Sequence, residues 1–436
     1  MEKIMKKYLL AVSALTASFF TTDAFAAGYH LSEYTVTGLG RSFAGAGVVG
    51  DDFSSLAFNP AGMQYNQTNG AQTGVTAVSL HFDYKGSIGT AASINKDGRP
   101  SELGPRSGSG HTRPTRVLPH VFAQQKLNDK TTLGLGVYVP YGLATDYDND
   151  WFAQSHAGLS QLSATNVSPA LSYQINDKFA VGGALNLQYI TARLTGNIEN
   201  GGMYFESGYN DLEGDDYGVG YTLGATFTPR KDIRLGVSYR SKIKHKLEGD
   251  LKISGMPSAV MGQPIKAMNG QSDIYTKVTM PEIVYLTGAY DLNKCFTLSA
   301  TAKWTRWSQF KNLDIFDKTT GVAVSETFEN WKNTWYYAVG ADYRYNRNWT
   351  FRTGIGYDET VIKEPKYRTA RIPDGRRILT SLGTTWKKDN WQVDLGYMHI
   401  FVHGGEVLGG AEKASSANLK YSADADLVSF GVQYKF

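Results

Sequence analysis

The sequence predicts an all-β fold: a transmembrane antiparallel β-barrel of about 14 strands, with an N-terminal hatch that plugs the lumen. Three observations predict it: an export signal, long stretches in which apolar and polar residues alternate, and a regular succession of short turns and long loops. The composition agrees with this fold, because 13% of the 436 residues are aromatic, with 27 Tyr and 8 Trp, and membrane barrels carry aromatic girdles at both strand ends.

The first 26 residues predict a cleavable signal peptide. Lysines at positions 3, 6 and 7 precede a largely apolar stretch over residues 8–20, and Ala24-Phe25-Ala26 fits a small-x-small cleavage site. We therefore expect residues 1–26 to be removed, a mature chain that begins at Ala27, and export to the bacterial outer membrane.

Charge and cysteine content exclude several classes of protein. The formal net charge of +4 is too small to indicate a nucleic acid partner. Cys295 is the single cysteine, so the chain can form neither an intramolecular disulfide nor a cysteine metal cluster. We expect no cofactor and no metal site.

Alternation with a period of two residues is the main strand signal. In the segment 233–240 the odd positions are apolar and the even positions are small or basic, which is typical of a strand with one apolar face. Because the polar set contains charges and glycines, we expect it to face a wet lumen, with the apolar set facing lipid. The same pattern occurs at 133–137, 167–175, 335–345, 351–358, 391–397 and 428–436.

Six short polar turns separate these strands, and they lie at 128–130, 176–178, 229–232, 291–294, 346–348 and 387–390. The other connections are longer, for example 86–114, 196–213, 249–270 and 404–418, and the short-turn, long-loop asymmetry is typical of outer-membrane barrels. Six turns join twelve strands, and a first and a last strand bring the number to about 14. The chain ends in a strand that closes on Phe436, which resembles the signal read by the barrel-assembly machinery.

Residues 27–66 break the alternation and predict the hatch, so the barrel is expected over 67–436. The segment contains a glycine-rich run at 38–47, then Asn59-Pro60-Ala61. The run has no clear preceding strand and no Lys-Ser/Thr ending, so it does not match a nucleotide-binding loop.

A family resemblance follows from these motifs. The stretch from Ala27-Gly28-Tyr29 through the glycine-rich run to Phe58-Asn59-Pro60-Ala61 resembles the hatch of the FadL/TodX family of outer-membrane long-chain fatty acid and hydrocarbon transporters. Segments 307–310, 348–355 and 371–377 resemble that family too. The resemblance implies a 14-stranded barrel in which apolar extracellular loops capture the ligand, a lumenal site holds it, and a kink in the third strand releases it sideways into the membrane.

Two long loops carry the candidate capture residues, which are Met203, Tyr204, Phe205, Met256, Val260, Met261, Ile265 and Met268. Flexible Met side chains adapt to varied apolar ligands, and exposed apolar clusters mark interaction sites. An alternative interpretation is that these residues only pack the loops together.

The third strand carries the candidate lateral opening, formed by Gly134, Gly136, Pro140 and Gly142. Proline cannot donate a ladder hydrogen bond and glycine leaves little side chain to fill a wall, so a bend or gap is expected. The alternative is a strand end that tolerates proline.

A fatty acid carboxylate in the lumen would need a basic partner. The candidates are Lys303, Arg352 and Arg193, although strict period-two parity turns Arg193 outward unless a bulge intervenes. Parity also turns Arg234, Arg240, Arg344, Arg377, Asp342, Asp358 and Asp394 inward, and most of these charges are expected to pair with one another.

The expected function is outer-membrane transport of hydrophobic molecules, with long-chain fatty acids as the first choice and aromatic hydrocarbons as the alternative. A general porin conflicts with a plug, and the histidines show no catalytic spacing, so we expect no enzyme activity. A receptor or adhesin without transport stays open. Expected partners are the hydrophobic ligand, outer-membrane lipids and the barrel-assembly machinery, and the chain is expected to be a monomer.

Overall fold

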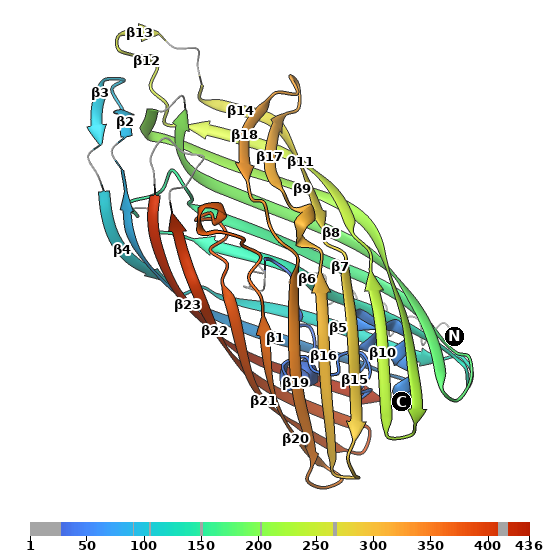
Figure 1. Ribbon diagram of the computed structural model, residues 1–436. Coiled ribbons are helices and arrows are strands. Elements are labelled where there is room, and N and C mark those ends of the chain that lie inside the picture. Colours follow the sequence, from blue (N-terminus) through green and yellow to red (C-terminus); the bar gives the residue numbers. More distant parts are fainter. Residues whose placement is uncertain are drawn as a thin grey trace.

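A computed structural model describes residues 28–89, 91–103, 106–148, 151–200, 203–264, 268–408 and 417–436. The predicted signal peptide (1–26) and the predicted first mature residue, Ala27, lie outside these ranges. The described chain forms a tilted barrel, with α2, α3 and η1 of the N-terminal segment inside it near one end (Figure 1).

Fourteen antiparallel strands of the described chain make a closed wall, which confirms the predicted fold and strand number. Each pairs with the next, and the last pairs with the first. In wall order they are β1 (Gly70–Ile88), β5 (Thr115–Lys126), β6 (Thr131–Asp146), β7 (Leu159–Gln174), β8 (Phe179–Asn200), β9 (Met203–Arg230), β10 (Ile233–Arg240), β15 (Ile283–Asp291), β16 (Phe296–Thr305), β19 (Thr334–Arg344), β20 (Trp349–Asp358), β21 (Arg376–Lys388), β22 (Trp391–Leu408) and β23 (Ala417–Lys435).

Shorter elements extend the wall or cross the ends. Strands β4 (Arg106–Thr112), β11 (Ile243–Ser254) and β14 (Gly270–Met280) prolong β5, β10 and β15, and the remaining strands are β2 (Ala91–Ile94), β3 (Pro100–Leu103), β12 (Ala259–Val260), β13 (Gln263–Pro264), β17 (Asn312–Asp317) and β18 (Ala323–Phe328). The helices are α2 (Val36–Leu39), α3 (Ser55–Phe58), η1 (Pro60–Tyr65), η2 (Trp307–Gln309) and η3 (Pro365–Tyr367). In the described ranges, every helix is too short to cross a membrane.

All six predicted short turns lie at one end of the barrel, which we call the turn end; the opposite end is the loop end. Four of the turns share one device: an asparagine Oδ1 accepts the backbone N–H two residues later, which closes an Asx turn. These asparagines are Asn128, Asn176, Asn293 and Asn346, with N···O distances of 2.8 to 2.9 Å.

One predicted loop is wrong. The segment 196–213 is largely a hairpin extension of the wall, because β8 runs to Asn200 and β9 starts at Met203. The wall therefore extends further at β8 and β9 than the alternation predicted. Strand residues beyond the membrane do not need an apolar outer face, so this part of the hairpin lacks the alternating pattern. The predicted loop 404–418 lies partly outside the described residues.

The structure confirms the prediction that the apolar residues of the alternating strands face outward and the polar residues face the lumen. Apolar residues on β10 such as Leu235 and Val237 are exposed on the outside, whereas Arg240 on the same strand is buried inside. All the charged residues predicted to point inward on the other strands are buried or partly buried. Residues 28–66 fill the turn half of the lumen and are nearly all buried.

Candidate functional site

The hatch is seated on the wall through Asn59. Its Oδ1 accepts from the backbone N–H of Ala61 at 3.1 Å, which caps η1, where Pro60 occupies the first position. Its Nδ2 donates to the backbone oxygens of Ala225 on β9 at 3.1 Å and Val237 on β10 at 3.3 Å. The predicted hatch residues therefore form the turn that docks on the wall.

Glycines in the wall make room for this turn. A Cβ at Gly182 would lie 2.5 Å from the backbone nitrogen of Ala61, and a Cβ at Gly224 would overlap Asn59 Oδ1. A side chain at either position would push the hatch off the wall. Glycine at these two positions is therefore a packing requirement of the plugged barrel.

A buried ionic network ties the hatch to the far wall. Arg41 of the hatch pairs with Asp51 at 2.7 Å and with Asp342 of β19 at 3.0 Å. Arg352 of β20 pairs with Asp51 at 3.0 Å and lies 3.7 Å from Asp342. The charge of Arg352 is already balanced by two carboxylates, so its position does not favour the predicted role as a ligand partner.

Lys303 lies in a different environment. Its Nζ is 3.3 Å from Nδ1 of His30 and 4.9 Å from the centre of the Tyr336 ring. Burial, together with the nearby Lys303 and Arg240, holds the pKa of His30 well below its usual range, so the imidazole is neutral and its Nδ1 can accept a hydrogen bond from the Lys303 ammonium. Within the described residues, no carboxylate lies within 4.0 Å of Lys303 Nζ.

Arg240 is another buried cation of the lumen without a carboxylate within 4.0 Å in the described chain. It donates to the backbone oxygen of Ala57 at 2.5 Å and to the hydroxyl of Tyr138 at 3.3 Å. Among the described residues, Nε and Nη1 of Arg240 and the nearby hydroxyls of Tyr34 and Tyr285 have no partner within 3.5 Å at a favourable hydrogen-bond angle. Unpaired buried donors are costly, so this group of side chains is suited to an additional acceptor.

Arg193 does not reach the lumen. The ladder between β8 and β9 is regular at this position, and Arg193 is paired across it with Glu213. Its guanidinium is 46% exposed and makes a bidentate contact with Asp211 at 2.9 and 2.7 Å. The candidate role of Arg193 as a ligand partner inside the barrel is therefore wrong. Its side chain points outward, as the strict period of two residues predicted.

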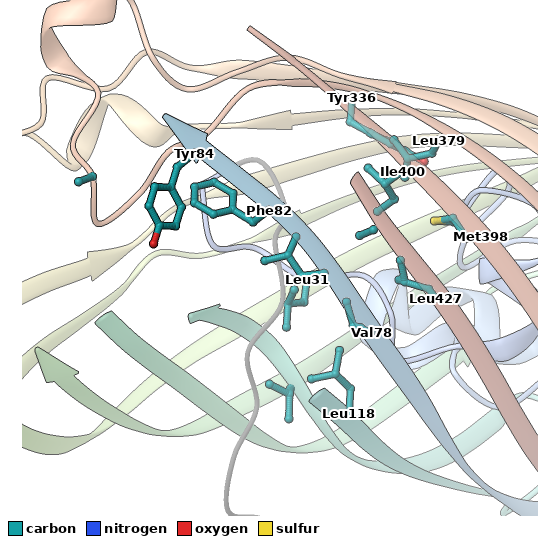
Figure 2. Close-up of a cluster of buried hydrophobic side chains, with 14 of the residues drawn as sticks. Leu31, Val78, Phe82, Tyr84, Leu118, Tyr336, Leu379, Met398, Ile400 and Leu427 are labelled. Atoms are coloured by element: carbon teal, nitrogen blue, oxygen red, sulfur yellow. The ribbon is translucent and has the colours of Figure 1, made fainter. Parts of the chain in front are cut away.

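Apolar clusters line much of the loop half of the lumen, beside the buried pairs of Arg377 with Asp358 and Asp374, so the predicted wet lumen is only partly correct. One cluster joins Leu31 of the hatch to inward-facing side chains of the wall (Figure 2). These side chains are Val78, Phe82 and Tyr84 of β1, Leu118 of β5, Tyr336 of β19, Leu379 of β21, Met398 and Ile400 of β22, and Leu427 of β23.

A second apolar cluster encloses the start of the hatch. The ring of Tyr29 lies 4.7 Å from that of Trp307 and 5.6 Å from that of Trp331, and Gly28 has a φ of +63°, with no space for a Cβ beside either tryptophan. Ile243 and Leu247 of β11 belong to the same cluster. Aromatic and aliphatic side chains thus surround the described N-terminus of the hatch.

Five of the eight predicted capture residues gather in one cluster at the loop end, which we call the capture cluster. Phe205 and Met256 are buried in it with Ile94 and Ile198, and the residues packed on them are Met203, Val260, Met268 and Ile253. Tyr204 is buried, and its hydroxyl accepts a hydrogen bond from Nδ2 of Asn197 at 2.7 Å. Met261 is 70% exposed, and Ile265 lies outside the described residues.

Strand β11 connects the capture cluster to the lumen. Ile253 packs on the capture cluster and also on a small cluster formed by Leu251, Ile274 and Ile315. Leu247, four residues below Leu251 on the same face of the strand, belongs to the lumen cluster. Apolar side chains on one face of β11 therefore span the distance from the loops to the hatch.

The predicted third strand, β6, leaves its neighbour β5 halfway along. Pairing between them ends at Val137, although both strands continue, and the ladder to β7 has a bulge between Tyr138 and Tyr141. The hatch replaces β5 here: the backbone N–H of Leu31 donates to the oxygen of Pro140 at 2.8 Å, and that of Gly142 donates to the oxygen of Tyr29 at 2.9 Å. The wall between β5 and β6 is thus interrupted, and the hatch lies across the interruption.

The lower glycines of β6 have another role. A Cβ at Gly134 would lie 2.5 Å from Met63 Sδ, and a Cβ at Gly136 would lie 2.7 Å from the ring of Phe122 and 2.9 Å from Leu56. Gly134 and Gly136 lie below the interruption and allow the hatch to approach the wall. Of the predicted opening residues, Pro140 and Gly142 are the two at the interruption itself.

Several residues of the site had no sequence signal of their own. His30 and Glu33 come from a segment without periodicity, and Trp307 and Trp331 lie on a long connection. Only the family resemblance pointed to Tyr29 and Trp307. Arg240 could be oriented by parity, but parity does not tell which inward charges find a partner.

The family is shown by comparison with known proteins. Residues 17–436 match the model of the family described as Outer membrane protein transport protein (OMPP1/FadL/TodX). The chain is 26% identical over 461 residues to a Long-chain fatty acid transport protein of Escherichia coli O6:H1, with 99% of both chains covered. It is 25% identical over 470 residues to Outer membrane protein P1 of Haemophilus influenzae, with 99% of this chain and 100% of that protein covered.

Solved structures show the same fold. A Pseudomonas aeruginosa FadL homologue is 24% identical, matches 94% of this chain and 100% of its own, and has a TM-score of 0.84. The Pseudomonas putida toluene transporter TodX is 16% identical, covers 94% of this chain and 100% of its own, and has a TM-score of 0.69. The plugged 14-stranded barrel is thus a member of the OMPP1/FadL/TodX family of outer-membrane transport proteins.

Proposed function

We propose that the protein carries long-chain fatty acids from the loop end into the outer membrane. The observation that carries the proposal is an apolar lumen that contains two buried cations, Lys303 and Arg240, neither paired with a carboxylate in the described chain. An aliphatic chain matches the first feature and a carboxylate matches the second.

The head group would meet Lys303 and Arg240. A carboxylate taken out of water needs charged or strong hydrogen-bond donors, and Arg240 has two N–H groups without a partner. His30 is neutral and bonded to Lys303, so it orients the ammonium without adding charge. The acyl chain would then lie among the aliphatic and aromatic side chains above the hatch.

Entry would start at the capture cluster. Met256, Met203 and Met268 are flexible and polarisable, so they adapt to chains of different length and unsaturation. The apolar face of β11 offers a continuous surface from this cluster to the lumen, so a chain that detaches from the loops need not return to water.

Release would be lateral, through the interruption between β5 and β6. In the part of the chain that the structure describes, two backbone hydrogen bonds, at Pro140 and Gly142, join the hatch to β6 here, so a small shift of residues 29–31 would uncover the interruption. Exit there delivers an apolar molecule into lipid and not into the aqueous periplasm.

The test is uptake of radiolabelled oleate by a strain that lacks its own fatty acid transporter and expresses this chain. We expect Lys303→Met and Arg240→Met each to lower oleate uptake about tenfold or more, the cost of one lost charged hydrogen bond. Arg193→Met is the matched control, because it removes an equal charge from the outer face. Normal oleate uptake by both lumenal variants would contradict the proposal.

Aromatic hydrocarbon uptake is the second candidate, because the apolar lumen itself does not require a charged ligand. Toluene has no carboxylate, so its uptake should not depend on Lys303 or Arg240. Restoration of toluene uptake without oleate uptake would favour this candidate, and restoration of neither would favour a receptor or adhesin.

A further inference from the structure

Four chemically similar side chains meet on the outer face of the barrel, at the seam where the wall closes. Strands β1, β22 and β23 pair there, with His81 opposite Asp424 and His399 opposite Asp426. Period-two parity turns all four outward, away from the lumen. Residues more than 300 positions apart thus share one patch of the surface.

The contacts within this patch are short. Nδ1 of His81 is 2.8 Å from Oδ1 of Asp424 and 3.8 Å from Oδ2 of Asp426. Nδ1 of His399 is 2.8 Å from Oδ1 of Asp426, which also accepts from the hydroxyl of Tyr397 at 2.6 Å. The donor atoms of His81, Asp424 and Asp426 all lie within 4.8 Å of one another.

We propose that His81, His399, Asp424 and Asp426 form a binding site for a divalent transition metal ion of the Zn²⁺ type. Two imidazoles and two carboxylates are the ligand set that borderline ions such as Zn²⁺ and Cu²⁺ favour, whereas Ca²⁺ and Mg²⁺ favour oxygen alone. The ligand atoms of His81, Asp424 and Asp426 already lie within 4.8 Å of one another and would form the core of the site. His399, which contacts Asp426 at 2.8 Å, would have to move toward them to become the fourth ligand. The Tyr397 hydroxyl would orient Asp426 as an outer-shell partner.

The position of the patch makes it accessible. The exposed fractions of the side chains are 34% for His81, 43% for Asp424, 33% for Asp426 and 23% for His399. Below them on β23 the outward residues are the apolar Val428 and Phe430, and above them comes Lys420. The site therefore lies at the upper edge of the apolar band, where ions from the aqueous phase can reach it.

A bound ion would connect the first strand, the last strand and the one before it. It would fasten the barrel at its closing seam, and it would bind the folded chain only, since the unfolded chain does not hold these residues together. This departs from the expectation of no metal site, because the ligands come from three strands and show no ligand spacing in the sequence.

The test is titration of ZnCl₂ into the full-length, untagged protein in detergent, after chelator treatment and removal of the chelator, followed by calorimetry. We expect saturable binding of one ion per chain. Zn²⁺ should also raise the unfolding temperature. His81→Ala, His399→Ala and Asp426→Asn should each weaken binding at least tenfold and lose that rise.

His403→Ala is the matched control, because this exposed histidine lies on β22 outside the patch and should bind Zn²⁺ like the wild type. The heat-modifiable gel mobility of each variant checks that its barrel is folded, and Asp424→Asn replaces any variant that is not. No saturable binding, equal binding by all variants, or binding of Ca²⁺ as tight as that of Zn²⁺ would each overturn the proposal.

Discussion

The two halves of the lumen are built in opposite ways. At the turn end, the hatch meets the wall through Asn59 and through the buried network of Arg41, Asp51, Asp342 and Arg352. At the loop end, apolar clusters line much of the lumen, and Lys303 and Arg240 lack carboxylate partners within 4.0 Å in the described chain. Directional contacts fix the position of a part, and apolar contacts leave it free to slide. The turn half of the lumen is therefore suited to holding the hatch in place, and the loop half is suited to the passage of a ligand.

The largest effect should come from breaking the anchor. Arg41→Met leaves Asp51 and Asp342 buried with Arg352 as their only remaining partner in the network, so we expect the free energy of unfolding to fall by about 3 kcal/mol. Urea unfolding in detergent measures this. Arg230→Met is the control, because it removes only an exposed ion pair with Asp232 at a turn and should leave the free energy of unfolding unchanged. An equal fall of the free energy of unfolding in both variants would contradict the difference between the two halves of the lumen.

A smaller effect is expected at the hatch turn. Asn59→Ala removes the cap of η1 and both bonds to the wall, which should cost about 1 to 3 kcal/mol and make the hatch accessible to protease. Limited proteolysis of residues 40–66 is the measurement. Asn176→Ala, which removes a similar backbone contact at an exposed turn, should leave the hatch protected.

Ligand passage through the loop half can be tested at the interruption of the wall between β5 and β6. Pro140→Val restores a backbone N–H to β6 and favours a regular strand, so oleate uptake should fall severalfold while the barrel stays folded. Pro169→Val on β7 is the control, because Pro169 is paired with Leu135 of β6 and lies away from the interruption between β5 and β6. Gly136 is a poor site for this test, since its replacement would displace Leu56 and Phe122. Equal uptake by both proline variants would argue against release at this position.

The smallest effect concerns the pH dependence of the hatch. Burial raises the pKa of Glu33, although its contact with the backbone N–H of Ser32 lowers it in part. A carboxyl with a raised pKa binds its proton more tightly in the folded state, so stability is lost as pH rises from the unfolded pKa of about 4.3 through the higher folded one. Glu33→Gln should remove this slope, and thermal unfolding between pH 4 and pH 8 measures it.

Much of the fold could be predicted because turn chemistry and period two are local properties. Asn128, Asn176 and Asn346 close their turns with their own side chains, so the residues that marked the turns also make them. On β10, the outward orientation of Leu235 and Val237 could be predicted from one rule, that the side chains facing lipid are apolar.

The apolar lumen could not be predicted from that rule, because alternation does not tell which face is inside. On β1 the even positions face inward throughout, yet the inward residues change from Gln72 and Thr76 to Leu80, Phe82 and Tyr84. The change occurs where the outer face leaves the lipid and meets water. The polar face then moves outside and the apolar face moves inside, with no break in the period.

Parity also fails where a strand is irregular. Between Arg240 and Ile243 the wall strand passes from β10 to β11, and the inward positions change from even to odd. Leu247 and Leu251 therefore face the lumen, whereas a strict period starting from Leu235 would turn them toward lipid. No local residue pattern marked this change.

The order of the hatch contacts bears on how the molecule is assembled. The hatch precedes β1, where the seam with β23 closes the wall. Helix α2 contacts β21, β22 and β23, which are synthesised last, whereas η1 contacts β7, β8 and β9, which are synthesised earlier. The hatch thus contacts strands from both ends of the sheet, and it offers one inner surface against which the first and last strands can pack as the seam forms.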